Sequence, residues 1–320
     1  MTTSPPISYD RTTGRLEGAT AAERCAALAF TAGAKVTAPM HYRGFSVGCR
    51  AITSMIEQRE IVVMLNDDAR FAFPFGDGYW SLLLDNKFVY EGEIERFLRS
   101  VADVDYCFLD GGANFGYWSV LVSSRPFGSH AVIAIEASSA NAARLKRNTE
   151  LNNGRFKFLR RAIAATTGGQ VWLSGGKHEA IRVGEMNGAE LGESVQTMTL
   201  DNLLDEGLVT PHQRLVVKFD VEGMEVDAAK GGKRLLDLET VLIIEDHGAD
   251  RAHTVSRYLL DKTPCRLFVF DPTSRRYERL MDPSMLDRIK TSTVFGYNIF
   301  ATNSPSWIER IRSIPPSTRH

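Results

Sequence analysis

The residues best suited to chemistry lie where an apolar stretch gives way to a turn rich in glycine. Residues 106–109 are expected to form a buried strand, and Asp-Gly-Gly-Ala-Asn-Phe-Gly follows at positions 110–116, just before a second apolar stretch. Glycines at a strand-to-helix turn let a ligand approach the backbone, and the first turn of a helix offers unpaired N–H groups. The pattern predicts a ligand-binding turn with contacts from Asp110, Gly112, Asn114 and Gly116.

The acidic residue in this turn favours one class of ligand over another. A dinucleotide site requires Gly-x-Gly-x-x-Gly with a phosphate at the helix start, whereas Asp110 would repel a pyrophosphate. A carboxylate suits a ligand that carries an ammonium or sulfonium group, and S-adenosylmethionine carries both. The turn therefore indicates a methyl donor and disfavours a dehydrogenase.

Two positions further along the chain complete the predicted donor site. A second apolar strand at 131–135 ends at Glu136, near the spacing at which a carboxylate meets the ribose hydroxyls of a bound nucleoside. A helix with a serine N-cap and a third strand at 156–159 follow. The turn after that strand, near Ala162, is expected to lie beside the adenine.

A second group of polar residues follows two apolar strands downstream. The strands at 215–219 and 240–244 alternate little, as expected when a parallel sheet is covered on both faces. Ligands of open α/β sheets bind beyond the carboxyl ends of the strands. We therefore expect the polar residues at the strand ends to gather at one edge: Asp110, Glu136, Asp220, Glu222, Glu245, Asp246 and His247.

Methyl transfer is an in-line displacement, so an enzyme must align the acceptor and accept one proton. Asp220 is the strongest candidate for this role, and His247 is a second candidate base because histidine titrates near neutrality. Lys218 lies on the same side of its strand as Asp220 and either pairs with it or contacts the acceptor. His247 could equally be a structural loop histidine. The predicted catalytic residues are Asp220, His247 and Lys218.

A magnesium site is an alternative use of the same edge. Asp220, Glu245 and Asp246 would supply three hard oxygen donors of the kind that Mg²⁺ accepts. Three such carboxylates repel one another unless an ion or a cationic substrate neutralises them.

These motifs together resemble the FkbM-type S-adenosylmethionine-dependent methyltransferases. The resemblance covers about residues 105–250 and rests on positions 109–116, 133–136, 199–203 and the block Lys-Phe-Asp-Val-Glu-Gly-Met-Glu at 218–225. Family members often continue Glu-Pro after the second strand, whereas this chain has Ala137 there. The resemblance implies a class I (Rossmann-like) α/β fold, with a mostly parallel seven-stranded sheet and helices on both faces. It also implies O-methylation of a sugar, glycan or related metabolite.

The rest of the chain suggests three parts. An N-terminal accessory α/β segment covers 1–104, the methyltransferase domain 105–303 and a C-terminal tail 304–320. The first 19 residues are polar and expected to be poorly ordered at the start, and a helix at 21–30, strands at 61–65 and 70–74 and a helix from Gly92 follow. Within the domain we expect an inserted strand pair around 170–173 and 195–198 with a mobile loop at 175–178, and final strands at 266–270 and 294–300.

Three residues of the accessory segment, Trp80, Tyr90 and Glu91, are plausible contributors to the pocket, although simple packing between segments is the more common role of such aromatics.

Composition narrows the function classes. The 320 residues carry a net charge of −1, which gives no electrostatic footprint for nucleic acid. The four cysteines have no metal-site spacing, and no apolar run approaches the roughly 20 residues that span a bilayer. We expect a cytoplasmic enzyme acting on a small-molecule or glycan acceptor, with no nucleic-acid or membrane partner and an oligomeric state that the sequence leaves open. The alternative is a non-catalytic module that binds the donor or a partner.

Overall fold

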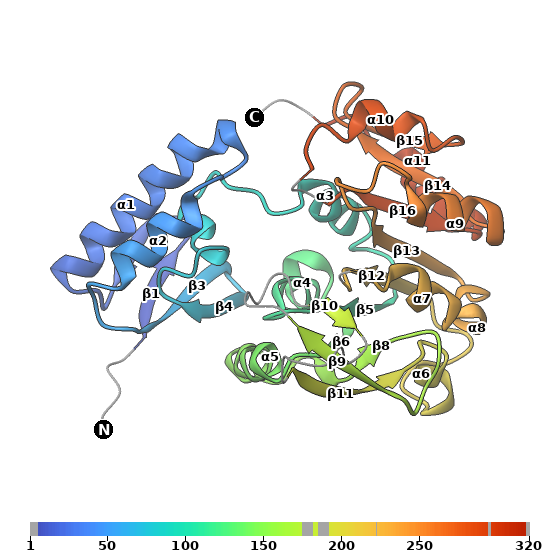
Figure 1. The fold of residues 1–320 in the computed structure, drawn as a ribbon, viewed down its shortest axis with the longest axis horizontal. Helices are drawn as coiled ribbons and strands as arrows, with labels where there is room; N and C mark the ends of the chain where they lie inside the picture. The colour runs from blue at the N-terminus through green and yellow to red at the C-terminus, as the bar shows by residue number, and fades with distance from the viewer. Residues whose placement is uncertain (1–5, 175–181, 185–191, 222, 294–295, 318–320) are drawn as a thin grey trace.

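A large twisted sheet forms the centre of the protein, and a smaller unit of sheet and helices lies beside it (Figure 1). The computed structural model describes residues 6–174, 182–184, 192–221, 223–293 and 296–317. In the large sheet the strands follow the order β15-β14-β16-β13-β12-β5-β6-β7. Their bounds are β5 Cys107–Gly111, β6 Ala131–Glu136, β7 Lys157–Arg160, β12 Leu215–Phe219, β13 Thr240–Glu245, β14 Arg266–Asp271, β15 Arg276–Leu280 and β16 Asn298–Thr302.

The direction of these strands is that of a class I methyltransferase fold. Strands β7, β6, β5, β12 and β13 pair in parallel, and β16 runs antiparallel to both of its neighbours. The predicted fold class is confirmed, but the sheet has eight strands rather than seven. The additional strand, β15, pairs with β14 at the edge of the sheet. Its sequence, Arg-Tyr-Glu-Arg-Leu, is too polar to be recognised as a strand.

Helices cover both faces of the large sheet. Successive strand residues point to opposite faces, and because the central strands are largely apolar on both, each face needs a covering layer. Phe108 belongs to the core on one face and its neighbour Leu109 to the core on the other. The first core includes α3 (Gly92–Ser100), α4 (Tyr117–Val122), α5 (Ser139–Leu151) and α11 (Pro305–Ser313). The second includes α6 (Asn202–Asp205), α7 (Glu225–Lys230), α8 (Lys233–Leu236), α9 (Thr254–Lys262) and α10 (Met285–Ile289).

The N-terminal segment forms a sheet of order β2-β1-β3-β4. Its elements are β1 (Ile7–Asp10), β2 (Arg15–Glu17), α1 (Ala21–Thr37), α2 (Phe45–Thr53), β3 (Glu60–Asn66) and β4 (Ala69–Pro74), with short 3₁₀ helices at Ala38–Met40, Trp80–Leu84 and Arg125–Phe127. The predicted strands at 61–65 and 70–74 are confirmed, and the helix predicted at 21–30 begins in a capping box between Thr20 and Glu23 but continues to Thr37. Both β1 and β2 lie in the stretch that was expected to start poorly ordered, and residues 1–5 are outside the described chain.

A third sheet, of order β10-β9-β11-β8, is inserted between β7 and β12. It consists of β8 (Ala162–Ile163), β9 (Gln170–Ser174), β10 (Arg182–Gly184) and β11 (Glu193–Met198). The predicted strand pair is confirmed as antiparallel β9 and β11. The loop predicted at 175–178 falls outside the described residues, as do positions 294 and 295 of the last predicted strand.

At the C-terminus, α11 lies in the segment expected to be a tail, and its Trp307 is buried and donates to the carbonyl of Glu239 at 3.0 Å. None of the described helices combines the length and the apolar composition needed to span a membrane.

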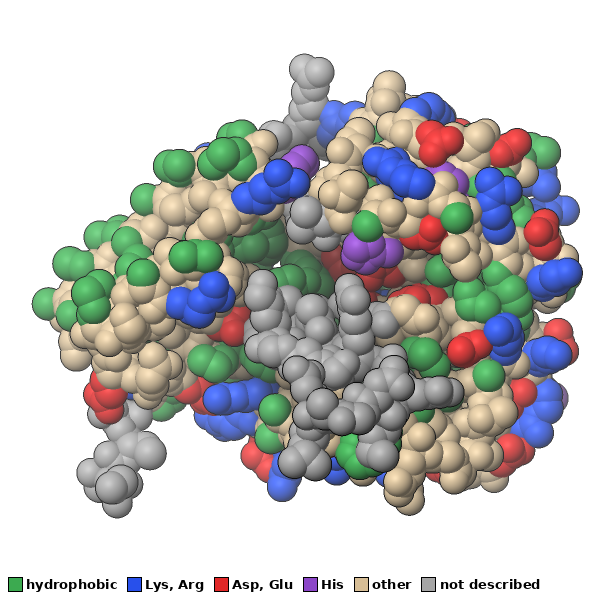
Figure 2. All heavy atoms as spheres, in the orientation of Figure 1, with side chains coloured by type: hydrophobic (Ala, Val, Ile, Leu, Met, Phe, Trp, Pro, Cys, Tyr) green, Lys and Arg blue, Asp and Glu red, His purple; other side chains and the backbone are tan. Residues whose placement is uncertain are grey.

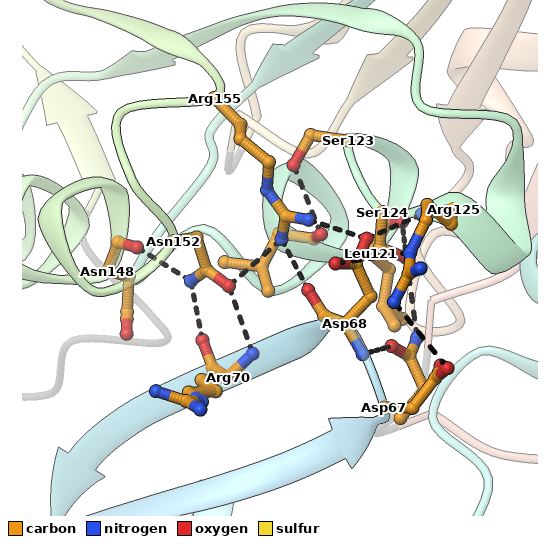
Figure 3. A network of polar contacts seen from close by, with 12 residues as sticks. Asp67, Asp68, Arg70, Leu121, Ser123, Ser124, Arg125, Asn148, Asn152 and Arg155 are labelled. Carbon is orange, nitrogen blue, oxygen red and sulfur yellow. Dashed lines mark hydrogen bonds and ion pairs between the residues drawn. The ribbon is translucent and has the colours of Figure 1, made fainter.

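Two asparagines of α5 join the N-terminal sheet to the large domain. Edge strand β4 leaves backbone groups that need partners, and α5 side chains supply them. Asn148 accepts from the Ala72 N–H at 2.7 Å and donates to the Ala72 carbonyl at 3.1 Å. Asn152 bonds in the same way to both backbone groups of Arg70, and Arg155 pairs with Asp68 at 2.7 Å (Figure 3).

Replacement of Asn148 by alanine is expected to destabilise the protein, because the amide also donates to the Phe115 carbonyl and the deletion leaves several buried backbone groups without partners. We expect the free energy of unfolding in urea to fall by roughly 2–3 kcal/mol. The control is Lys146→Ala on the exposed face of the same helix, expected to change it by less than about 0.5 kcal/mol. Equal effects of the two substitutions would contradict the claim that Asn148 joins the N-terminal sheet to the large domain.

Candidate active site

Close contacts with other parts of the protein require glycine in the turn after β5. Gly112 has φ +74°, and a Cβ there would lie 1.7 Å from the carbonyl oxygen of Asp220. The Asp220 N–H donates to the Gly111 carbonyl at 3.1 Å, so the ends of β5 and β12 are tied together. At Gly116, with φ +86°, a Cβ would meet Leu145 Cδ1 at 2.4 Å. A side chain at either position would therefore clash with neighbouring protein atoms, so the fold itself requires glycine there.

A cavity nevertheless opens beside this turn, at the carboxyl ends of β5, β6 and β12. Five of the six predicted donor-site residues line it: Asp110, Gly112, Asn114, Glu136 and Ala162. Gly116 is not among the lining residues; its contact with Leu145 leaves no room for a side chain in the turn. Apolar side chains of Ile135, Ile163 and Leu173 form another part of the wall.

Glu136 presents a buried carboxylate to this cavity. Its two oxygens accept hydrogen bonds from the backbone N–H groups of Asn114 and Ser138, both at 2.8 Å. Burial raises the pKa of Glu136 to about 7, although these hydrogen bonds oppose the shift. The side chain therefore changes charge near neutral pH.

Asp110 and Asn114 combine a place in the cavity wall with structural contacts. One carboxylate oxygen of Asp110 accepts from the Ser119 hydroxyl at 2.6 Å and from the Ser119 N–H at 3.1 Å, which holds the start of α4. Asn114 has a left-handed backbone (φ 53°), and its side-chain oxygen accepts from the Trp80 indole at 3.3 Å. The N-terminal segment thus contacts the donor turn directly.

The ammonium of Lys218 lies buried at the end of β12 among carboxylates. It is 3.3 Å from Asp220 Oδ2 and 3.9 Å from Glu91 Oε2. Burial alone would lower the pKa of Lys218, but Glu91, Asp220 and Asp110 outweigh it and raise that pKa. Lys218 is therefore a permanent cation, and the predicted pairing with Asp220 is present.

Asp220 and Glu245 form a coupled pair beside this cation. Burial would raise the pKa of Asp220, but Lys218 and a hydrogen bond with Glu245 lower it. Burial and the charge of Asp220 raise the pKa of Glu245 well above its ordinary value. The arrangement is that of a protonated Glu245 donating to an ionised Asp220.

A second, larger cleft meets the donor cavity at Asp220. It lies between the N-terminal unit, the carboxyl ends of β13 and β14 and the amino end of β16, and Figure 2 shows a hollow there with acidic side chains at its floor. Asp220, Tyr79, Trp80 and Tyr90 line both spaces. His247 lines the outer cleft with an exposed side chain, whose Nδ1 accepts from the Ala249 N–H at 3.1 Å.

Residues 110–262 match the family model described as the methyltransferase FkbM domain. These residues form an FkbM methyltransferase domain. The chain is also 26% identical to the hexuronic acid methyltransferase AglP of Haloferax volcanii over 174 residues, which are 53% of this chain and 67% of that protein.

Solved structures that are similar to this chain at low identity include two methyltransferases. The methyltransferase FkbM from Methylobacillus flagellatus KT has 16% identity and a TM-score of 0.39, and the match covers 61% of this chain and only 43% of that one. The O-methyltransferase from Bacillus cereus, in complex with SAH, has 14% identity and a TM-score of 0.38 over 68% of this chain and 83% of that one.

The donor cavity of the FkbM domain fits S-adenosylmethionine in its chemistry. Glu136 is placed to accept the ribose hydroxyls, and Ala162, Ile163 and Leu173 offer an apolar wall for the adenine. Asp110 and Asp220 provide negative charge for the cationic part of the molecule. The donor set therefore matches a nucleoside with a positively charged arm.

The three predicted magnesium ligands are not brought together. Asp246 is fully buried and turned to other partners: its carboxylate contacts the Ser256 hydroxyl and accepts from Lys290 Nζ at 2.5 Å. In the part of the chain that the structure describes, no group of three or more metal-binding side chains occurs. Asp246 is therefore removed from the predicted set, and Glu222 lies outside the described residues.

Sequence reasoning missed several residues that line the outer cleft, among them Tyr79 and Asn298. Tyr79 shares a hydrogen bond of 2.8 Å between its hydroxyl and that of Tyr90, and Asn298 donates to Glu91. Trp80 and Tyr90 pack against each other and also line both cavities, and Glu91 lines the outer cleft. Packing between segments and a place in the pocket therefore occur together. The aromatic cluster at 79–80 was the only available signal, because nothing local to Asn298 marks it.

Glu136→Gln is expected to weaken the binding of S-adenosylhomocysteine, because an amide cannot accept two ribose hydroxyls. By calorimetric titration, the affinity of the unchanged protein should rise as pH passes through about 7, where the carboxylate ionises. The variant should bind at least about tenfold more weakly at pH 8 and show no such rise. An unchanged affinity would contradict the assignment; Glu150→Gln on the exposed face of α5 is the control.

The same pKa has a consequence for stability. The folded pKa of Glu136 is raised from 4.5 to about 7, so its contribution is complete below pH 4.5 and is lost as pH rises to 7. The cost of ionising the buried carboxyl is of order 3 kcal/mol. As pH rises from 4.5 to 7, the free energy of unfolding in urea should therefore fall less for Glu136→Gln than for the unchanged protein.

Proposed function

We propose that this chain transfers a methyl group from S-adenosylmethionine to a hydroxyl of a sugar, a glycan or a related metabolite. The proposal rests on one observation above all: Asp220, in the most specific sequence block, lines both the donor cavity and the outer cleft. A reactive carboxylate at the junction of two cavities suits a transfer between ligands held in each.

The residues around the junction have separate roles in this proposal. Glu136 and Asp110 would hold S-adenosylmethionine, which would supply the methyl group; its sulfur would keep the electron pair of the broken bond as the acceptor oxygen bonds to the methyl carbon. Asp220 accepts the hydrogen bond of the acceptor hydroxyl and takes up its proton. Lys218 keeps Asp220 ionised, and His247, exposed in the same cleft, is a second candidate proton acceptor.

The lining of the outer cleft favours a sugar acceptor without negative charge. Aromatic rings of Tyr42, Phe88, Phe270 and Tyr297 can pack against the C–H faces of a sugar, and Asp220 and Glu245 supply carboxyls for its hydroxyls. Among the described residues that line this cleft there is no lysine or arginine. We therefore infer a neutral sugar in preference to a uronic acid, even though one relative is named a hexuronic acid methyltransferase.

The second candidate function is a non-catalytic module that binds the donor or a partner. Such a module would bind S-adenosylhomocysteine and have no turnover. The junction at Asp220 favours the enzyme, because a binding module needs no carboxylate between two cavities.

The test is methyl transfer to a panel of neutral sugars, amino sugars and uronic acids, followed as release of S-adenosylhomocysteine. We expect turnover on a neutral sugar and, at saturating donor, a rate at least about 100-fold lower for Asp220→Asn. Asp227→Asn, at a half-exposed carboxylate that pairs with Lys230, is the control. Turnover on uronic acids alone would contradict the acceptor class, and donor binding without turnover on any acceptor would favour the module.

A further inference from the structure

We propose that Glu91, which the N-terminal segment inserts into the active site, is a positioning residue for methyl transfer. Its carboxylate holds the Lys218 ammonium so that Asp220 stays free to receive the acceptor's proton. This inference rests on the proposed function and assigns to the N-terminal segment a direct part in it.

The backbone of Glu91 is held in an uncommon conformation. The residue precedes α3 with φ 44° and ψ 60°, a left-handed conformation that side chains other than glycine and asparagine seldom adopt. Such a conformation persists only where surrounding contacts impose it, and it is frequent at functional sites. Here it directs the carboxylate inward, toward the end of the large sheet.

Three contacts from three elements receive this carboxylate. Glu91 Oε2 accepts from the Trp118 indole of α4 at 2.7 Å, and Oε1 accepts from the Asn298 amide of β16 at 3.2 Å. Lys218 of β12 lies 3.9 Å from Oε2. Because Trp118 lines the donor cavity and Asn298 lines the outer cleft, Glu91 spans the boundary between them.

The charge of Glu91 matters because Lys218 is buried and must be neutralised. With Glu91 present, the ammonium is shared between two carboxylates at 3.3 and 3.9 Å. Without that charge, Lys218 would interact with Asp220 more strongly. Asp220 would then be a weaker proton acceptor and would have an oxygen less available to the substrate.

Glu93 provides a matched control two residues away. It lines the same outer cleft and accepts a hydrogen bond from the same Asn298 amide at 2.8 Å. The ion pairs of Lys218 within the described chain go to Glu91 and Asp220, not to Glu93. A general effect of removing a carboxylate from this cleft would therefore show in both residues, whereas positioning of Lys218 would show only in Glu91.

The experiment compares Glu91→Gln and Glu93→Gln in the full chain. Glutamine keeps an oxygen for Trp118 and removes the charge, together with the oxygen that accepts from the Asn298 amide; Glu93→Gln also alters an acceptor of that amide. We expect the kcat of Glu91→Gln to fall at least about tenfold while the affinity for S-adenosylhomocysteine stays close to that of the unchanged protein. Glu93→Gln should remain within about twofold in kcat.

The pH profile gives a readout that a merely structural role would not move. Loss of the Glu91 charge leaves Lys218 less compensated, so the pKa of the Asp220–Glu245 pair falls and the acidic limb of kcat should shift to lower pH. The ionisable groups that interact with this pair or with Lys218 are, besides these residues themselves, Glu91, Asp110, Glu225, His247, Tyr79 and Tyr90. Glu93→Gln should leave the limb in place.

A measurement without any acceptor separates this inference from the proposed function. The Lys218 ammonium should give a slowly exchanging ¹H–¹⁵N signal that Glu91→Gln shifts or broadens and Glu93→Gln does not. Absence of turnover in the unchanged protein would overturn the proposed function, whereas equal signals and equal kcat values in the two variants would overturn the role of Glu91 alone.

Discussion

The buried ammonium of Lys218 is the constraint around which the active site is arranged. A buried cation is costly unless carboxylates surround it, and here they come from three parts of the chain: Asp110 near the end of β5, Asp220 after β12 and Glu91 from the N-terminal segment. The same charge keeps Asp220 ionised while Glu245 retains a proton. Fold and chemistry are therefore coupled at one atom, Lys218 Nζ, because the contacts that neutralise it also define the junction of the two cavities.

The N-terminal segment acts as a part of the enzyme's architecture. Asn148 and Asn152 bind its edge strand on one side of the turn, and Trp80 and Glu91 reach the donor turn and Lys218 on the other. Its core is continuous with that on one face of the large sheet. The segment thus closes the outer cleft with aromatic and acidic side chains, which gives the cleft the character from which we infer a neutral sugar acceptor.

Sequence reasoning succeeded where the signal was local. Buried strands such as β12 and β13 are continuous apolar runs, and the carboxyl ends of parallel strands share one edge, so the grouping of Asp110, Glu136 and Asp220 followed from order alone. It failed where the cause is long-range. Nothing local shows that the Asp220 carbonyl occupies the space beside Gly112, or that Lys290 takes Asp246 away from the edge. Strands β1 and β15 were missed because they are short and, in their sequence context, polar.

A crystal structure of the chain with S-adenosylhomocysteine tests the central claim most directly, because it locates the donor relative to Asp220. The account predicts the ribose hydroxyls within hydrogen-bond distance of Glu136, the adenine against Ala162 and Ile163, and the sulfur facing the outer cleft beside Asp220. A nucleoside bound elsewhere, or bound with its sulfur turned away from Asp220, would contradict it.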